Sequence, residues 1–392
     1  MYRQIKIKHG REKSFINRHP WVFSGALASL PDYSNGEIVE VITSDAVIMG
    51  YGFFSPDSRI SCRIFEFTDI HVPKFDADYF AAKISRASAL RGRFIDKKIT
   101  DCWRLLHAEG DFFPGLIIDV YGDTAVVQAL IMGVELILED IADGLESLGY
   151  NNIFIKNSGV NRVEGVSSDN YLLRGEMRER VAVMENSLKF TVDIAGGQKT
   201  GFFLDQRDNR ELVRSLAHGK RVLNAFCYTG GFSVYALAGG AESVHSVDIS
   251  GSAINMTDEN ISLNFGDTGR SVSIKEDCFE YLRKMDSDYF DVIILDPPAF
   301  VKHASGVDKG ARGYKDINLN ALRRIKKDSL LLTFSCSQHV SQDLFRKIVF
   351  SAAADAGRNV RVLRQLSQGA DHPVSIFHPE GEYLKGLLLH VE

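Results

Sequence analysis

The chain has 392 residues, of which 45% are hydrophobic and 25% are charged, and its formal net charge is −5 at pH 7. The length exceeds what one ordinary core holds, so we expect two or three domains of a globular protein. The acidic balance excludes a uniformly basic nucleic-acid-binding protein. No apolar run reaches the length of a membrane span, and the charged start Met1–Lys8 has no signal-peptide core. We therefore expect a cytoplasmic protein without a membrane partner.

Short apolar segments separated by turn-forming residues predict a small β domain over the first 70 residues. Apolar residues at helical spacing predict a helix over 76–95, and a β meander follows it over 102–131. A second helix is expected over 134–148, then a strand at 153–156 and a polar segment to about residue 180. The strands expected in the first domain are Glu37–Ile42, Val47–Phe54 and Ile60–Phe67.

From about residue 187 onward, strand and helix patterns alternate, which is typical of a doubly wound, mostly parallel α/β sheet. No helix separates the last two strands, so we expect the final strand to be antiparallel. The expected strands are 221–226, 243–247, 272–275, 291–295, 329–334, 360–366 and 386–391, and the expected helices are 231–240, 251–264, 278–285, 316–326 and 341–356.

The first of these strands runs into a turn, Asn224–Phe232, in which Gly230 and Gly231 precede a helix. Glycines at a strand-to-helix turn let a ligand approach the backbone, although this turn is not a dinucleotide-binding G-x-G-x-x-G motif. Asp248 ends the second strand and can bind a ribose diol, while Asp277 after the third can accept a hydrogen bond from an adenine amino group. This order of features predicts an S-adenosylmethionine (SAM) site of the class I methyltransferases.

The fourth strand ends in Asp296-Pro297-Pro298-Ala299-Phe300. The prolines fix the backbone and lack N–H groups, so the loop displays its carbonyls and a carboxylate toward a planar target. Phe300 could stack on a base. The alternative interpretation is that Pro-Pro merely ends a strand.

The fifth strand ends in Ser335-Cys336-Ser337. Cytosine C5 is too poor a nucleophile to take a methyl group directly, whereas addition of a thiolate to C6 activates C5. That chemistry needs a thiol and an acid at N3, and we assign these roles to Cys336 and Asp296. His372 is a candidate for the base that removes the C5 proton, or a structural loop residue.

The five cysteines are Cys62, Cys102, Cys227, Cys278 and Cys336, with no C-x-x-C pair among them. This pattern fits a reducing compartment and predicts neither a metal site nor a disulfide framework. A buried cysteine usually acts as a small hydrophobic residue. We expect that packing role for all of them except Cys336.

Two stretches are locally basic. Residues 1–20 contain six Lys or Arg against one acidic residue, and residues 302–327 contain eight against two. For either stretch alone, the favoured interpretation is an ordinary solvated surface. The second lies between the two strand-end motifs, so we expect it to contact a polyanion.

These motifs, in this order, resemble the bacterial RlmI-type methyltransferases, which form 5-methylcytosine in 23S ribosomal RNA. The segments 197–207, 224–232, 296–300, 313–318, 334–337 and 370–373 match that family, and His19–Gly25 resembles the opening of its PUA domain. The resemblance implies a PUA-like RNA-binding β barrel at 1–70, a central α+β domain at 71–185, and a class I (Rossmann-like) SAM-dependent methyltransferase domain at 186–392.

The resemblance also implies the site residues. SAM would lie against Gln198, Phe202, Asn224, Phe226, Tyr228, Thr229, Gly230, Gly231, Asp248, Asp277 and Asp296. The RNA would contact Lys199, Gln206, Pro297, Pro298, Phe300, Arg312, Tyr314, Lys315, His372, Arg18 and Trp21. Cys336 is the expected nucleophile, no metal is expected, and a homodimer stays open. Two alternatives also stay open: a ribosomal RNA guanine methyltransferase (N2 or N7) with an inert Cys336, and a non-catalytic RNA-binding assembly factor.

Overall fold

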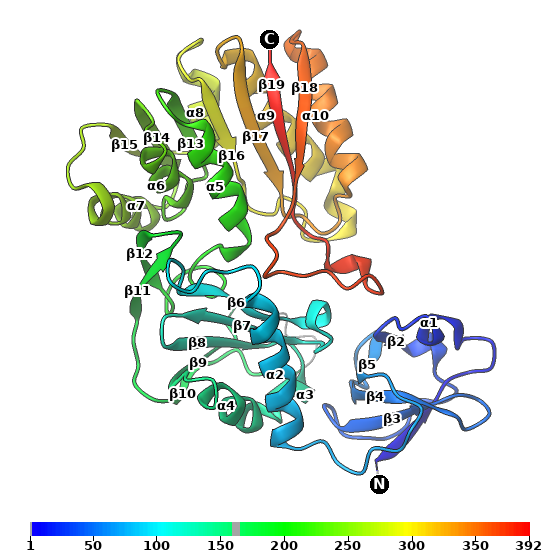
Figure 1. The fold of residues 1–392 in the computed structure, drawn as a ribbon. Helices are drawn as coiled ribbons and strands as arrows, with labels where there is room; N and C mark the ends of the chain where they lie inside the picture. Colours follow the sequence, from blue (N-terminus) through cyan, green and yellow to red (C-terminus); the bar gives the residue numbers. More distant parts are fainter. Residues whose placement is uncertain (1, 159–164) are drawn as a thin grey trace. The chain divides into compact units, whose positions relative to one another are not determined.

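A computed structural model describes residues 2–158 and 165–392, and its chain forms two compact units (Figure 1). The first unit comprises Met1–Val183, Val192–Leu204 and Ala370–Gly381. The second comprises Met184–Thr191, Asp205–Gly369 and Glu382–Glu392. The predicted three-domain division stays a prediction, since 192–204 and 370–381 cluster with the first unit.

The N-terminal part of the first unit is a five-stranded sheet in the order β1-β3-β4-β5-β2. Its own apolar core includes Val39, Val41 and Phe54, all with no exposed surface. The three predicted strands are confirmed. The elements are β1 (Arg3–Lys6), α1 (Lys13–Ile16), β2 (Trp21–Phe23), β3 (Ile38–Ile42), β4 (Ile48–Phe54) and β5 (Ile60–Glu66).

A second five-stranded sheet, in the order β10-β9-β8-β7-β6, forms the rest of the first unit. Helices α2 and α4 approach closely at Gly144, where an added Cβ would lie 3.0 Å from the Cα of Ala81. The elements are α2 (Ala77–Arg91), β6 (Cys102–His107), β7 (Leu116–Tyr121), β8 (Thr124–Ala129), α3 (Met132–Glu135), α4 (Leu138–Glu146), β9 (Asn152–Lys156) and β10 (Asn170–Arg174).

Two predictions for this sheet were wrong. The single helix expected over 134–148 is two helices, because the helical backbone is interrupted between Glu135 and Leu138. The segment read as polar loop to residue 180 contains β10, which pairs antiparallel with β9. Residues 159–164 of that segment lie outside the described residues.

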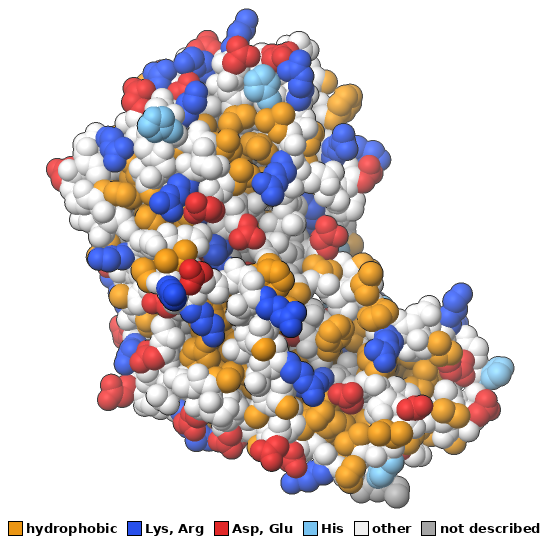
Figure 2. Space-filling view, in the orientation of Figure 1, with side chains coloured by type: hydrophobic (Ala, Val, Ile, Leu, Met, Phe, Trp, Pro, Cys, Tyr) orange, Lys and Arg blue, Asp and Glu red, His pale blue; other side chains and the backbone are white. Residues whose placement is uncertain are grey.

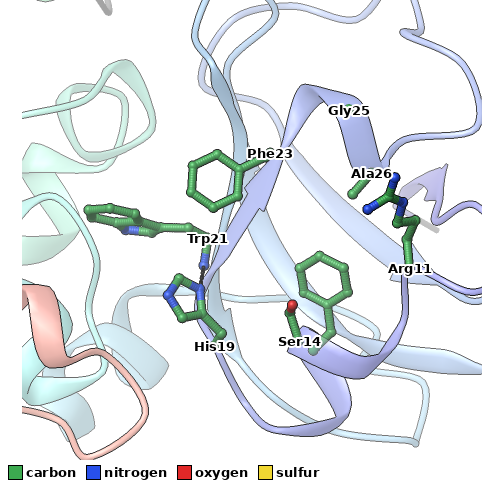
Figure 3. Close-up of a pocket in the computed structure, with 8 residues that line it drawn as sticks. Arg11, Ser14, His19, Trp21, Phe23, Gly25 and Ala26 are labelled. Carbon is green, nitrogen blue, oxygen red and sulfur yellow. Dashed lines mark hydrogen bonds between the residues drawn. The ribbon is translucent and has the colours of Figure 1, made fainter.

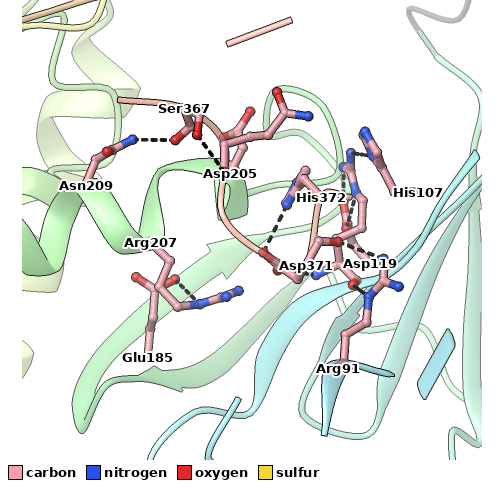
Figure 4. A network of polar contacts seen from close by, with 12 residues as sticks. Arg91, His107, Asp119, Glu185, Asp205, Arg207, Asn209, Ser367, Asp371 and His372 are labelled. Carbon is pink, nitrogen blue, oxygen red and sulfur yellow. Dashed lines mark hydrogen bonds and ion pairs between the residues drawn. The ribbon is translucent and has the colours of Figure 1, made fainter. Parts of the chain in front are cut away.

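Buried ion pairs hold the segment 370–381 within the first unit (Figure 4). The guanidinium of Arg91 forms hydrogen bonds of 2.5 and 2.6 Å to the carboxylate of Asp111, and donates to the backbone oxygen of Asp371 at 2.8 Å. The Asp371 carboxylate accepts a 3.0 Å bond from the Arg104 backbone N–H. Arg104 in turn makes a bidentate pair with Asp119, both bonds 2.8 Å. Buried charges require such pairing, since an unpaired one is strongly destabilising.

The second unit contains a seven-stranded sheet in the order β15-β14-β13-β16-β17-β19-β18. β19 is antiparallel to both of its neighbours, as predicted, while the other pairs are parallel. The strands are β13 (Arg221–Ala225), β14 (Ser243–Asp248), β15 (Ser271–Lys275), β16 (Val292–Leu295), β17 (Ser329–Ser335), β18 (Val360–Leu366) and β19 (Lys385–Val391). A two-stranded hairpin, β11 (Arg180–Glu185) and β12 (Leu188–Asp193), precedes this sheet.

Helices alternate with these strands, so the fold is the predicted doubly wound α/β sheet. An apolar core joins α8, α9 and α10 to the central strands, including Leu223, Ile293 and Leu331. The helices are α5 (Arg207–Leu216), α6 (Gly231–Ala238), α7 (Gly251–Phe265), α8 (Cys278–Lys284), α9 (Val307–Arg324) and α10 (Gln342–Ala356).

Helix α9 begins nine residues earlier than predicted. Its first half contains Gly310 and Gly313, which lower helix propensity and led to the wrong start. Both glycines have a packing reason. A Cβ at Gly310 would lie 2.2 Å from the Val301 side chain, and one at Gly313 would lie 3.2 Å from the Phe300 ring. The glycines let the loop after β16 pack directly on the helix.

Candidate active site

Four parallel strands, β14, β13, β16 and β17, lie side by side in the sheet, so their carboxyl ends share one edge. The chain runs from β13 outward to β14 and β15 on one side, and to β16 and β17 on the other. Such a reversal of strand order opens a crevice at the carboxyl ends, where open α/β sheets bind ligands. The predicted motifs end these strands: the glycine turn, Asp248, Asp296 and Cys336.

The turn after β13 has a strained backbone. Phe226 and Tyr228 have positive φ angles of 62° and 48°, and Gly230 has a φ of 78°. Contacts hold this conformation: the N–H of Tyr228 donates to the Asp248 carboxylate at 3.0 Å, and the Thr257 hydroxyl donates to the backbone oxygen of Tyr228 at 2.9 Å. Non-glycine residues held in this region are concentrated at functional sites.

The carboxylates of Asp248 and Asp277 are both held by backbone N–H groups, and their contacts with the adenosine part of SAM stay predictions. One Asp248 oxygen accepts a 3.0 Å bond from the N–H of Tyr228, and the other accepts a 2.9 Å bond from the N–H of Ser250. These bonds fix a partly exposed carboxylate in the position that binds ribose hydroxyls in such sheets. Asp277 caps α8 through Oδ1, which accepts from the N–H groups of Phe279 and Glu280.

The predicted cofactor contact of Asn224 stays a prediction. Asn224 is 1% exposed and its side-chain nitrogen donates to the hydroxyl of Ser233 at 2.9 Å. The hydroxyl oxygen of Ser233 lies 2.7 Å from that of Ser246 on β14. Asn224 therefore belongs to a buried chain of hydrogen bonds that links β13, α6 and β14. The side-chain oxygen of Asn224 has no hydrogen-bond partner within the described residues.

The thiol of Cys336 contacts the proline loop. Cys336 follows β17 directly, is partly exposed, and its sulfur lies 3.8 Å from the backbone oxygen of Pro297. Asp296 precedes that proline and is also partly exposed. The structure therefore brings the two strand-end motifs together.

Ser337, the residue after Cys336, also bonds to the loop that follows β16. Its hydroxyl oxygen accepts a 3.0 Å bond from the N–H of Val301 and lies 2.8 Å from the phenol oxygen of Tyr314. Tyr314 has no exposed surface, because its ring packs within the core of the second unit. Its predicted direct contact with RNA is therefore corrected: Tyr314 positions the loop from inside.

Phe300 packs between aromatic rings. Its centroid lies 4.6 Å from that of Tyr314, 5.6 Å from that of Phe279 and 6.4 Å from that of Phe226. These contacts fix the ring at the end of the proline loop. Stacking of Phe300 on a base stays a prediction, as do RNA contacts by Pro297 and Pro298.

The other four cysteines are buried, as expected for packing residues. Burial raises the pKa of the Cys62 and Cys227 thiols well above the ordinary range, and that of Cys278 to about 12. The sulfur of Cys278 accepts the N–H of Phe226 at 3.1 Å, so this thiol supports the glycine turn. Cys336 alone among the five is partly exposed.

Several predicted site residues belong to the first unit and not to the sheet that carries the strand-end motifs. Gln198, Lys199 and Phe202 belong to the first unit, where the Lys199 ammonium lies 4.5 Å from the Phe203 ring centroid. His372 is in the same unit, and its Nδ1 lies 3.1 Å from a carboxylate oxygen of its neighbour Asp371. Their roles toward cofactor or RNA stay predictions.

Gln206 belongs to the second unit. Its side-chain oxygen accepts a 2.6 Å bond from Asn209, which also donates to the backbone oxygen of Ser367 at 3.1 Å (Figure 4). Asp205 beside it binds the Tyr383 hydroxyl at 2.5 Å. These bonds tie the start of α5 to the segment that leads into β19.

Four of the eight cations of the basic stretch 302–327 bond to other parts of the second unit: Lys315, Arg323, Arg324 and Lys326. Lys315 pairs with Asp355 at 2.7 Å and Lys326 with Asp291 at 3.0 Å, while Arg324 donates to the backbone oxygen of Met285 at 3.0 Å. Arg312 is exposed on α9. On the face drawn in Figure 2, Lys and Arg are interspersed with Asp and Glu. The other four cations, Lys302, Lys309, Arg312 and Lys327, are exposed, and contact of this stretch with a polyanion stays a prediction.

A pocket of about 310 Å³ lies in the N-terminal sheet domain, lined by Arg11, Ser14, Phe15, His19, Trp21, Phe23, Gly25 and Ala26 (Figure 3). The Trp21 backbone N–H donates to the His19 ring at 3.2 Å, and its indole N–H donates to Glu109 at 2.8 Å. Phe23 is 48% exposed beside it. Arg18 is exposed with a φ of 61° in the turn before this pocket.

Comparisons with known proteins agree with this architecture. Residues 158–331 match the family model for S-adenosylmethionine-dependent methyltransferases, and residues 5–67 match a PUA-like domain. The chain is thus a SAM-dependent methyltransferase that carries a PUA-like domain. Proteins named ribosomal RNA large subunit methyltransferase I are 40% identical in Pseudoalteromonas atlantica, over 100% of both chains, and 41% identical in Aeromonas hydrophila, over 99% of both. The chain belongs to this ribosomal RNA large subunit methyltransferase I family.

Solved structures show the same fold. A Streptococcus mutans protein assigned as a SAM-dependent methyltransferase is 23% identical with a TM-score of 0.83, over 99% of this chain and 100% of that one. A methyltransferase crystallised with S-adenosylhomocysteine is 22% identical with a TM-score of 0.85, over the same shares. Within residues 2–158 and 165–392, no helix is long and apolar enough to cross a membrane, and no cluster of acidic, His and Cys side chains could hold a metal.

Sequence reasoning missed one charged residue beside the predicted nucleophile. Lys385 begins β19 and is 4% exposed, although lysine is rarely buried. A signal was available, since a lysine directly before the apolar run of a strand predicted to be antiparallel is unusual. Pairing with the adjacent strand could not be predicted without the strand order.

Proposed function

We propose that the protein methylates C5 of a cytosine in 23S ribosomal RNA, with Cys336 as the nucleophile. The contact between the Cys336 sulfur and the proline loop carries the proposal. A partly exposed thiol at this strand end, beside a carboxylate, is what cytosine-C5 chemistry needs. The names of the relatives support the ribosomal RNA of the large subunit as substrate.

In this mechanism the Cys336 thiolate forms a bond to C6 of the cytosine, and the C5–C6 electron pair shifts toward N3. Asp296 in its protonated form would donate its proton to N3 as N3 gains this charge, and would take the proton back when C5 attacks the methyl group. C5 then accepts the methyl group, which SAM supplies when it is bound. Loss of the C5 proton to a base restores the double bond, and the sulfur–C6 pair returns to Cys336. The target base must be flipped out or unpaired for both faces to be reached.

The surface of the PUA-like domain supports the same proposal. The exposed Arg11 lines the pocket that contains Trp21 and Phe23 (Figure 3). The exposed Arg18 precedes His19, which lines the same pocket. Cations bind phosphates without regard to sequence, and aromatic rings stack on unpaired bases. This surface can therefore hold single-stranded RNA through its basic and aromatic residues.

The test is transfer of labelled methyl groups from SAM to 23S RNA that lacks the modification, followed by nucleoside analysis. We expect label in 5-methylcytidine with the wild type and none with Cys336→Ala, which should still bind S-adenosylhomocysteine. Cys62→Ala is the matched control, because it removes a buried thiol from the N-terminal core and should keep turnover.

Other outcomes identify the alternatives. Label in a guanosine, or full activity of Cys336→Ala, would make the protein a guanine methyltransferase in which Cys336 only packs. RNA and SAM binding without any release of S-adenosylhomocysteine would support a non-catalytic assembly factor.

A further inference from the structure

Lys385 places an ammonium group at the turn that carries Cys336. In the antiparallel pairing of β17 with β19, Lys385 lies opposite Ser335, the residue before Cys336. Its Nζ donates to the backbone oxygen of Ser337, the residue after Cys336, at 2.7 Å. A second 2.7 Å bond goes to the backbone oxygen of Tyr383. The ammonium group is thus held by the backbone oxygen of the residue after Cys336 and by that of Tyr383.

The environment of Lys385 is unusual for a lysine. Burial lowers its pKa to about 8, while charge on Cys336 and Glu382 acts in the opposite direction. These are the titratable groups that interact with it electrostatically. A buried ammonium group is costly, so a position that retains one has a reason beyond packing. Two carbonyls accept hydrogen bonds from the ammonium group, and the bond to Ser337 brings its charge to the turn that contains Cys336.

We infer that Lys385 is a positioning residue that keeps Cys336 in the thiolate form. The inference rests on the proposed function, in which Cys336 is the nucleophile. The thiolate, and not the thiol, attacks C6. Its proton passes to solvent while Lys385 keeps its own, so the pair carries one negative and one positive charge. The same charge stabilises the sulfur again when it leaves C6.

A purely structural role is the competing interpretation, in which Lys385 only ties β19 to the turn after β17. The electrostatic role and the structural role predict different pKa values for the Cys336 thiol. An opposite charge within about 4–6 Å lowers a neighbouring acid's pKa by roughly 1–3 units. A structural tie changes stability and leaves the pH dependence of the thiol unchanged.

The experiment is alkylation of the full-length chain with iodoacetamide across a pH series, with Cys336 modification followed by peptide mass spectrometry. We expect Lys385→Met to move the midpoint of the Cys336 profile upward by about one unit or more, with roughly tenfold slower alkylation on the acidic side. Lys385→Arg retains the charge and should stay near the wild-type midpoint. Thermal melts and S-adenosylhomocysteine binding check that each variant is folded.

An unchanged midpoint in folded Lys385→Met would overturn the inference. If that variant does not fold, Lys385→Gln keeps a donor for the carbonyls without the charge and is read in the same way. If neither folds, the wild-type profile decides: a midpoint at or above about 8.5, the value of an unperturbed cysteine, also overturns it.

Alkylation does not require methyl transfer, so the two proposals fail separately. An upward shift in Lys385→Met together with no 5-methylcytidine from wild type would uphold the role of Lys385 and reject the reaction. Formation of 5-methylcytidine by the wild type, together with an unchanged midpoint in Lys385→Met, would uphold the reaction and reject the role of Lys385.

Discussion

The hydroxyl oxygen of Ser337 lies 2.8 Å from the phenol oxygen of Tyr314, which is 23 residues earlier in the chain. The same hydroxyl accepts the N–H of Val301, so one small side chain joins the turn after β17, the loop after β16 and helix α9. The nucleophile and the proline loop are therefore held by a single buried junction, and removing that hydroxyl should disturb both.

We expect Ser337→Ala to lower the free energy of unfolding by about 1–3 kcal/mol, because the buried N–H of Val301 loses its acceptor. Turnover should fall further than stability explains, since the position of Cys336 depends on this turn. Tyr314→Phe is the matched variant: it keeps the bond between Val301 and Ser337 and should cost only about 1 kcal/mol. Denaturant melts and single-turnover rates measure both effects, and equal behaviour of the two variants would contradict this account.

Asp248→Asn should weaken binding of S-adenosylhomocysteine roughly 10- to 100-fold, because a charge-assisted hydrogen bond to the ribose becomes a neutral one. Isothermal titration calorimetry gives the affinity directly. Asp267→Asn is the control: Asp267 also accepts a backbone N–H two residues on, from Gly269 at 3.3 Å, but in an exposed turn. Unchanged affinity in Asp248→Asn would remove this carboxylate from the cofactor site.

Gly230→Ala should be destabilising by more than about 2 kcal/mol, since the new Cβ would lie 2.6 Å from the Thr257 side chain at a φ of +78°. Gly219 has a φ of +65° but nothing within 4 Å of an added Cβ. Gly219→Ala thus measures the backbone strain alone, about 1 kcal/mol. The difference between the two melts reports the contact with Thr257, and no difference would mean that α7 moves aside freely.

Lys156 predicts a pH dependence of stability in the first unit. It is 2% exposed, and its ammonium donates to the backbone oxygen of Gly197 at 2.7 Å. Burial lowers its pKa from 10.5 to about 8. Below about pH 8, Lys156 is protonated in both the folded and the unfolded chain. Between about pH 8 and pH 10.5, it is protonated only in the unfolded chain. The stability contributed by this site therefore rises with pH between these two values.

Chemical denaturation of wild type and Lys156→Met across that window measures this linkage. We expect wild type to gain about 1–3 kcal/mol relative to the variant as the pH rises. The exposed Lys98→Met provides the baseline and should show no such change. A flat difference between wild type and Lys156→Met would mean that this lysine is not desolvated.

Arg18→Gln should weaken binding to ribosomal RNA and reduce the salt dependence of affinity by roughly one counterion. Arg3→Gln is the matched control in the same domain, since Arg3 already pairs with Glu37 at 3.4 Å. Filter binding at several salt concentrations distinguishes them. Equal effects of both variants would mean that charge in the N-terminal domain acts only at long range.

The sequence predicted the sheet and its strand ends because apolar strands and punctuating Gly and Pro residues are local signals. It missed what depends on contacts between distant segments. Gly310 and Gly313 indicated a break in the helix, yet both lie inside α9. The loop after β16 packs where side chains at these two positions would lie.

The same limit explains the part of the candidate site that sequence could not supply. Asp296 and Cys336 stand out by their motifs, and both end adjacent parallel strands as expected. Lys385 has no motif, and only the insertion of β19 beside β17 brings it to the thiol. Strand order in a sheet is set by long-range packing, which no local pattern encodes.

The two compact units are interleaved in sequence, since Val192–Leu204 and Ala370–Gly381 return to the first unit from within the second. A single genetic crossover could therefore not exchange the catalytic sheet for that of another methyltransferase without severing these returning segments. The N-terminal sheet, which ends with β5 at Glu66, is contiguous in sequence, so one junction separates it from the rest of the chain, although its Tyr51, Phe53 and Phe65 pack in the core of the central sheet. Recombination during evolution should thus vary the N-terminal domain while transmitting the remainder of the chain intact.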